Sequence, residues 1–95
     1  MNKNDPQTEK YEAQIREWKA ELDALKAKAD KQSAETRLAY NQKINDLELK
    51  LTELREKVKQ IQSTFGEARE KLGKGVEEAY KELSKAFSEA IKEFK

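Results

Sequence analysis

The sequence predicts an all-α protein built on coiled-coil packing, and three observations support this prediction. In two stretches, large apolar residues recur at alternating steps of three and four, which is the spacing of a coiled-coil seam. Further along, the apolar pattern repeats every eleven residues, which is also a helical period. The 95 residues are 41% charged and 36% hydrophobic, and Ala, Glu, Lys, Leu and Arg dominate, as they do in long helices.

The first helix is expected to begin at Pro6, after a frayed tail at residues 1–5. Asp5 can accept hydrogen bonds from the free N–H groups of the first turn, and proline at the first helical position loses no needed donor. The apolar residues that follow define the first seam: Tyr11, Ile15, Trp18, Leu22, Leu25 and Ala29.

A second seam with the same spacing starts at Tyr40 and runs through Ile44, Leu47, Leu51, Leu54, Val58 and Ile61 to Phe65. Between the two seams only Gln32 and Thr36 continue the pattern, at steps of four, which is a stutter near residues 32–40. Residues 30–37 contain neither Gly nor Pro, so we predict one long helix over residues 6–63. The alternative is a hairpin at Gln32-Ser33, which would give a bundle of three helices.

The next boundary is expected at residues 64–66, with an amphipathic helix over residues 67–95. Thr64 and Glu67 have the spacing of a capping box, and Gly66 lowers the cost of a turn. The helix that follows shows the eleven-residue repeat, in which Leu72, Leu83 and Phe94 fall at equivalent positions.

We predict that this shorter helix folds back antiparallel on the long one, as a helical hairpin. The residues expected to pack in the hairpin are Ile44, Leu47, Leu51, Leu54, Val58, Ile61, Leu72, Val76, Leu83, Phe87 and Ile91. A return helix of about 43 Å, at 1.5 Å per residue, would reach only the second seam.

The first seam would then stay exposed, at a cost of about 1.5 to 3 kcal/mol for each large apolar side chain. Two chains are therefore expected to pair antiparallel through their N-terminal halves, as a homodimer or higher homo-oligomer. The expected oligomer interface consists of Tyr11, Ile15, Trp18, Leu22 and Leu25.

Composition argues against several classes of function. With no His and no Cys, the usual nucleophile–base pairs are missing, so we expect no enzyme, no cofactor and no metal site. Twenty basic and nineteen acidic residues give a net charge of +1, which disfavours nucleic acid as a partner. No signal peptide and no long apolar span is recognisable, so a cytoplasmic location is expected.

A lipid surface is the alternative partner. The eleven-residue repeats resemble those of exchangeable apolipoproteins, and Phe65, Phe87 and Phe94 could form one lipid-facing side. Residues 65–95 carry seven basic and seven acidic side chains without a cationic patch, so packing within the protein is favoured over membrane contact.

Residues 11–31 (YEAQIREWKAELDALKAKADK) and 66–94 (GEAREKLGKGVEEAYKELSKAFSEAIKEF) resemble a family of small bacterial coiled-coil proteins described as stress-response proteins. The resemblance implies a non-enzymatic helical protein and supplies no active-site residue. The function expected from the sequence is that of a self-associating coiled-coil scaffold or interaction protein whose protein partner is unknown, and the resemblance implies a role related to stress.

Overall fold

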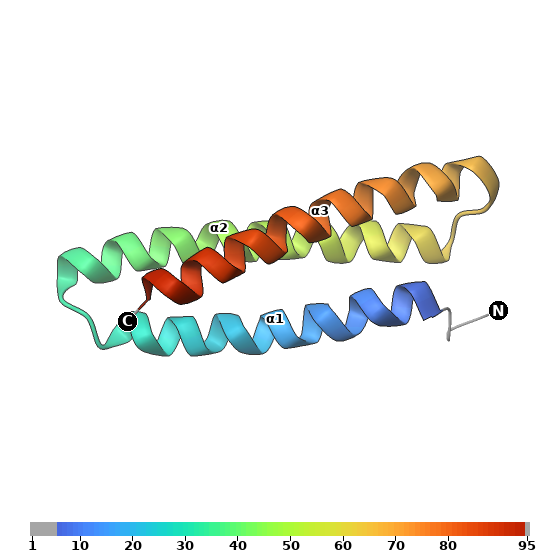
Figure 1. Ribbon diagram of the computed structural model, residues 1–95. Helices are drawn as coiled ribbons and strands as arrows, with labels where there is room; N and C mark the ends of the chain where they lie inside the picture. The colour runs from blue at the N-terminus through green and yellow to red at the C-terminus, as the bar shows by residue number, and fades with distance from the viewer. Residues whose placement is uncertain (1–5, 95) are drawn as a thin grey trace.

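The computed structural model describes residues 6–94, which form three helices (Figure 1). These are α1 (Pro6–Asp30), α2 (Ala34–Gln62) and α3 (Gly66–Glu93). Each helix runs antiparallel to the one before it, and the three pack along their lengths into a rod of 51 × 20 × 17 Å. The all-α class is confirmed for this part of the chain, which contains no strand.

The structure contradicts the single long helix predicted over residues 6–63, because α1 ends at Asp30 and α2 begins at Ala34. Ser33 has extended backbone angles, φ −61° and ψ 163°, and its carbonyl accepts the first hydrogen bond of α2 from the Arg37 N–H at 2.8 Å. The expected stutter is a turn, as in the alternative with a hairpin at Gln32-Ser33. Folding back here buries the first seam against the second, which outweighs the few helical hydrogen bonds lost at the turn.

The second turn covers residues 63–65, one residue earlier than predicted. Gly66 has φ +68°, a conformation that glycine adopts without the steric penalty of a Cβ. The predicted capping box does not form, since Phe65 occupies the N-cap position and makes no side-chain cap hydrogen bond. The Thr64 hydroxyl instead donates to the carbonyl of Gln60 in the last turn of α2.

One apolar core joins the first seam, the second seam from Tyr40 to Ile61 and the inner face of α3, whereas Phe65, the last residue predicted for the second seam, is 80% exposed. Of the residues expected to pack in the hairpin, all those on α2 are buried, as are Val76, Leu83 and Phe87 on α3. Leu72 is partly buried against the core. Ile91 departs from the expectation, because its side chain is 42% exposed; the neighbouring Ala90 takes the inward position instead.

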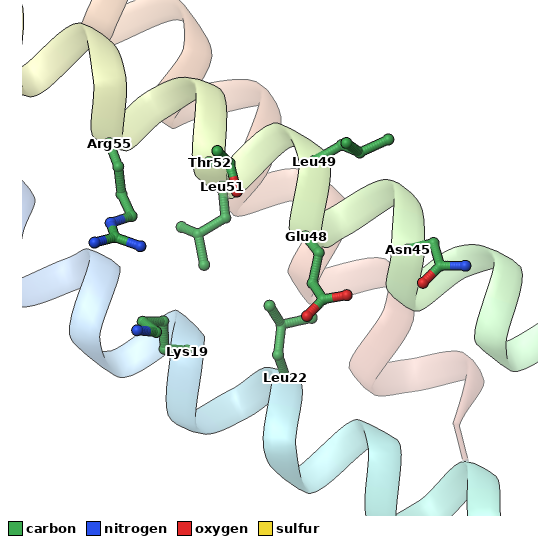
Figure 2. A pocket seen from close by; sticks show the side chains of 8 residues that line it. All are labelled: Lys19, Leu22, Asn45, Glu48, Leu49, Leu51, Thr52 and Arg55. Atoms are coloured by element: carbon green, nitrogen blue, oxygen red, sulfur yellow. The ribbon is translucent and has the colours of Figure 1, made fainter.

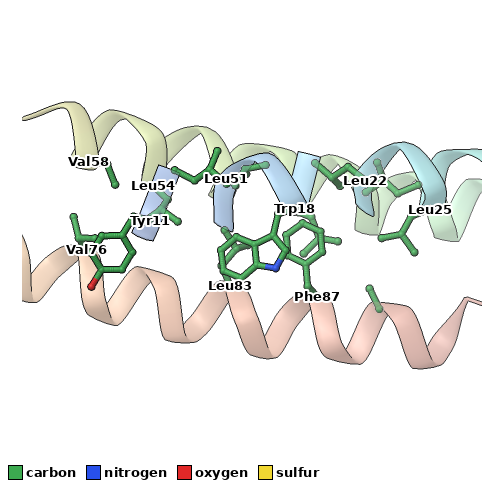
Figure 3. Close-up of a cluster of buried hydrophobic side chains, with 14 of the residues drawn as sticks. Tyr11, Trp18, Leu22, Leu25, Leu51, Leu54, Val58, Val76, Leu83 and Phe87 are labelled. Atoms are coloured by element: carbon green, nitrogen blue, oxygen red, sulfur yellow. The ribbon is translucent and has the colours of Figure 1, made fainter. Parts of the chain in front are cut away.

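Aromatic side chains bridge α1 and α3 (Figure 3). The Trp18 ring stacks on Phe87, with centroids 5.2 Å apart and planes at 4°. Tyr80 lies beside both Trp18, at 5.3 Å, and Tyr11, at 5.4 Å. Helix α3 therefore packs against both seams, and not against the second seam alone as the hairpin model required.

Candidate functional site

The five residues expected to form an oligomer interface lie inside the protein. Tyr11, Ile15, Trp18, Leu22 and Leu25 are each at most 7% exposed. The turn after Asp30 supplies α2 as their partner, and α3 supplies the aromatic contacts, so a second chain is not needed to cover them. The interface was expected because the first seam would otherwise be exposed, and the structure buries this seam within one chain. The oligomeric state itself stays a prediction.

The three residues of the expected lipid face do not share an exposed surface. Phe65 is 80% exposed, but Phe87 and Phe94 are 1% and 3% exposed. Phe94 stacks on Tyr40 with ring centroids 3.9 Å apart, which ties the end of α3 to the start of α2. The repeat places Phe87 and Phe94 on the inner side of the bundle, while Phe65 precedes the helix.

Residues 6–94 contain no cluster of metal-ligating side chains. Within that range no group of three or more His, Cys, Asp or Glu side chains could hold a metal ion. Every buried side-chain nitrogen or oxygen there has a hydrogen-bond partner. None of the described helices combines the length and the apolar character needed to cross a membrane.

Two groups in this part of the chain titrate away from their ordinary values. Burial raises the pKa of Tyr11, with smaller contributions from the charge of Glu77 and from Tyr80. The hydrogen bond from Lys26 Nζ to Glu48, at 2.8 Å, raises the pKa of that lysine, and the carboxylate charge adds to the effect. Both shifts come from contacts between helices, since Glu48 lies on α2 while Glu77 and Tyr80 lie on α3.

A groove of about 570 Å³ lies between α1 and α2 (Figure 2). The buried side chains of Leu22 and Leu51 lie at its base, and the exposed Leu49 points outward at its edge. Arg55 extends from α2 toward α1, and Lys19 lies on the α1 side of the groove (Figure 2). The remaining lining residues are Asn45, Glu48 and Thr52.

A second hollow, of about 270 Å³, continues this groove toward the end of α2 and shares Lys19 and Arg55 with it. Ile15 and Val58 are the buried residues that line it. Four cations and one acidic residue complete the lining: Arg16, Lys19, Arg55, Lys59 and Glu12. We refer to the four cations as the basic quartet.

Sequence reasoning missed the basic quartet, although a signal was present. Each of its members directly follows a seam residue, as Lys19 follows Trp18 and Arg55 follows Leu54. Such positions flank the contact between packed helices. They could be assigned to one groove only once the first seam was known to pair with the second within the chain.

A second missed feature is the outer face of α2, where Leu38 is 62% and Leu49 is 68% exposed. Together with three uncharged, exposed residues, these two leucines are spaced four, three, four and three residues apart along the helix. This α2 outer stripe consists of Leu38, Gln42, Asn45, Leu49 and Thr52. The stripe is a weaker coiled-coil pattern than the inner seam of the same helix, which hid it in the sequence.

Comparisons of this chain with protein-family models, with curated proteins and with solved structures found no match. The resemblance to stress-response coiled-coil proteins therefore stays a prediction.

Proposed function

We propose that the protein is a non-enzymatic helical scaffold that associates with a second copy of itself through the α2 outer stripe. The observation that supports this proposal is the exposure of Leu38 and Leu49 at coiled-coil spacing on one face of α2. Exposed leucines at a/d spacing favour helix pairing, because pairing removes them from water.

The composition of the stripe supports a helix as its partner. None of its five residues is charged, in a chain that is 41% charged overall. Asn45 and Gln42 lie between the two leucines, and polar residues within a seam fix register and partner number at a cost in stability. With only two large apolar residues in the stripe, we expect a weak dimer that dissociates on dilution.

Light scattering on a sizing column, over a range of protein concentrations, tests this proposal. The chain mass is 11.0 kDa, and we expect the measured mass to rise toward twice that value as concentration increases. Leu38→Glu combined with Leu49→Glu should hold the protein at the mass of one chain. Phe65→Glu is the matched control, since Phe65 is an exposed apolar residue outside the stripe, and it should leave association unchanged. A single-chain mass for the unmodified protein at every concentration would overturn the proposal.

Peripheral lipid binding is the alternative, and it requires the bundle to open. Phe87 and Phe94 would have to leave their stacking contacts with Trp18 and Tyr40 before they could enter a membrane interface. Co-flotation of the protein with anionic vesicles, measured together with the loss of these contacts, would favour this function over the scaffold. We include a role in stress response on the basis of the resemblance alone, and a location in the cytoplasm on the basis of the sequence alone.

A further inference from the structure

The side of the bundle where α1 meets α2 has an unusual distribution of charge. Arg16 and Lys19 on α1 face the same hollow as Arg55 and Lys59 on α2, so cations stand opposite cations across the helix contact. All four side chains are exposed, and none forms an ion pair with any described residue. Positions that flank a helix contact commonly hold opposite charges, which stabilise the pairing. The basic quartet instead places like charges at these positions, and their repulsion lowers the stability of the free protein.

A direct link between α1 and α2 lies on either side of the quartet. On one side, Lys26 pairs with Glu48 at 2.8 Å. On the other, Gln62 Nε2 donates to Glu12 Oε2 at 3.1 Å; glutamine is neutral, so Glu12 keeps its negative charge at the edge of the hollow. The hollow between these two links therefore gathers four cations and one acid, in a chain whose net charge is only +1.

The groove beneath these cations is apolar and elongated. Its floor is formed by Ile15, Leu22, Leu51 and Val58, each at most 6% exposed. Its α2 side runs from Asn45 to Lys59, which is about 21 Å at 1.5 Å per residue. A groove between two antiparallel helices is where a further helix packs in a four-helix bundle.

We propose that this groove binds an acidic amphipathic helix of another protein. The apolar side of that helix would cover Leu49, the exposed apolar residue of the lining, and its Glu or Asp residues would pair with the basic quartet. The match rests on charge complementarity, because arginine and lysine bind carboxylates through charge-assisted hydrogen bonds. A helix of this chain itself fits less well, since α3 carries acidic and basic residues interleaved along its length.

The repulsion within the quartet has a further consequence. Replacing Lys19 by Glu would place opposite charges across the groove and should raise the melting temperature of the free protein while weakening the acidic partner's binding. A residue that lowers stability in the free protein and serves a binding site is the expected trade-off of function against stability. A merely structural role for Lys19 would instead predict that the same change lowers the melting temperature.

The probes for the test are two synthetic helical peptides of about 14 residues, the length of the groove at 1.5 Å per residue. Both have leucine along one face, and one carries Glu at the flanking positions where the other carries Lys. Fluorescence anisotropy of the labelled peptides gives the affinities. We expect the Glu peptide to bind at least tenfold tighter than the Lys peptide, with affinity falling as salt rises. Equal binding of the two peptides, or no binding of either, would overturn the proposal.

Variants locate the site. Lys19→Glu with Arg55→Glu should invert the preference, so that the Lys peptide binds tighter. Lys28→Glu with Lys92→Glu makes the same change in net charge outside the groove and should leave the preference as it is. Circular dichroism confirms that each variant is folded. Loss of Glu-peptide binding in both pairs of variants would assign it to net charge and reject the site.

Self-association and peptide binding are separated by repeating the measurement in Leu38→Glu, since Leu38 does not line the groove. Asn45, Leu49 and Thr52 belong both to the stripe and to the groove, so a dimer would compete with the peptide. This variant should therefore bind the Glu peptide at least as tightly as the unmodified protein does. Binding of anionic vesicles that depends on the quartet, without binding of the Glu peptide, would show that the groove takes lipid headgroups and would also overturn the proposal.

Discussion

The stack of Trp18 on Phe87 offers a direct test of how the chain folds, because these residues are far apart in sequence and meet only if α3 packs against α1. In a hairpin built on one long helix, Trp18 would lie beyond the reach of α3. The perturbation is a double-mutant cycle with Trp18→Leu, Phe87→Leu and the combination of both. Leucine keeps the positions apolar, so each single variant should remain folded.

The size of the expected coupling follows from the ring geometry. Centroids 5.2 Å apart lie within the range in which aromatic pairs contribute about 0.5 to 1.5 kcal/mol beyond the burial of their area. Each single substitution should lower the free energy of unfolding by about 0.5 to 3 kcal/mol, the usual range for a point change. The double variant should then lose less than the sum of the two, by about 0.5 to 1.5 kcal/mol.

Chemical denaturation followed by far-ultraviolet circular dichroism measures these free energies, at a concentration low enough for single chains to dominate. Trp18 and Phe94 form the control pair, since both are buried and Phe94 stacks on Tyr40 instead. Separated residues usually add to within about 0.5 kcal/mol. A Trp18–Phe87 coupling no larger than that of the control pair would refute the packing of α3 on α1.

Three further predictions concern stability. Gly75→Ala should raise the free energy of unfolding by about 1 kcal/mol, because Gly75 is helical and a Cβ there meets nothing within 4 Å. Gly66→Ala should lower the free energy of unfolding by about 1 to 2 kcal/mol, because φ is +68° at that position. Urea titrations that gave both changes the same sign would contradict this pair of predictions. Leu25→Ala should lower the free energy of unfolding by about 2 to 5 kcal/mol, since Leu25 is fully buried. Phe65→Ala, at a position that is 80% exposed, should change the free energy of unfolding by less than about 0.5 kcal/mol. The raised pKa of Tyr11 means that the native state favours the neutral phenol, so its contribution to stability is complete below the ordinary pKa of 10.0 and is lost as pH rises through the folded-state pKa. Tyr11→Phe should therefore flatten the fall in melting temperature at alkaline pH. An unchanged dependence of melting temperature on pH would argue against the pKa shift.

The sequence was sufficient to predict helical structure and the apolar faces, but not the division of residues 6–63 into two helices. Heptad spacing depends only on which residues recur along one face of a helix, so both seams could be read directly, and the residues of the first seam are indeed buried. The eleven-residue repeat likewise placed Val76, Leu83 and Phe87 on a common face of α3. Ile91 departed from its expected position because a wide apolar arc does not show which of its members point at a neighbouring helix.

The candidate sites were harder to foresee. The basic quartet combines residues from two helices, and its members share a groove only because α1 and α2 lie side by side. Single cations on a helix surface are ordinary in a chain with 20 basic residues. Their grouping became significant when the structure placed all four around one hollow with a single acidic residue.

The sequence by itself determined that the protein is helical and that the first seam must be covered by another helix. It did not determine whether that helix comes from a second chain or from the same one. The tertiary structure decided this by turning the chain after Asp30, at a place without glycine or proline. The physical reason is that local propensity at residues 31–33 permits both a continuous helix and a turn, and the burial of two seams against each other, which no local pattern records, favours the turn.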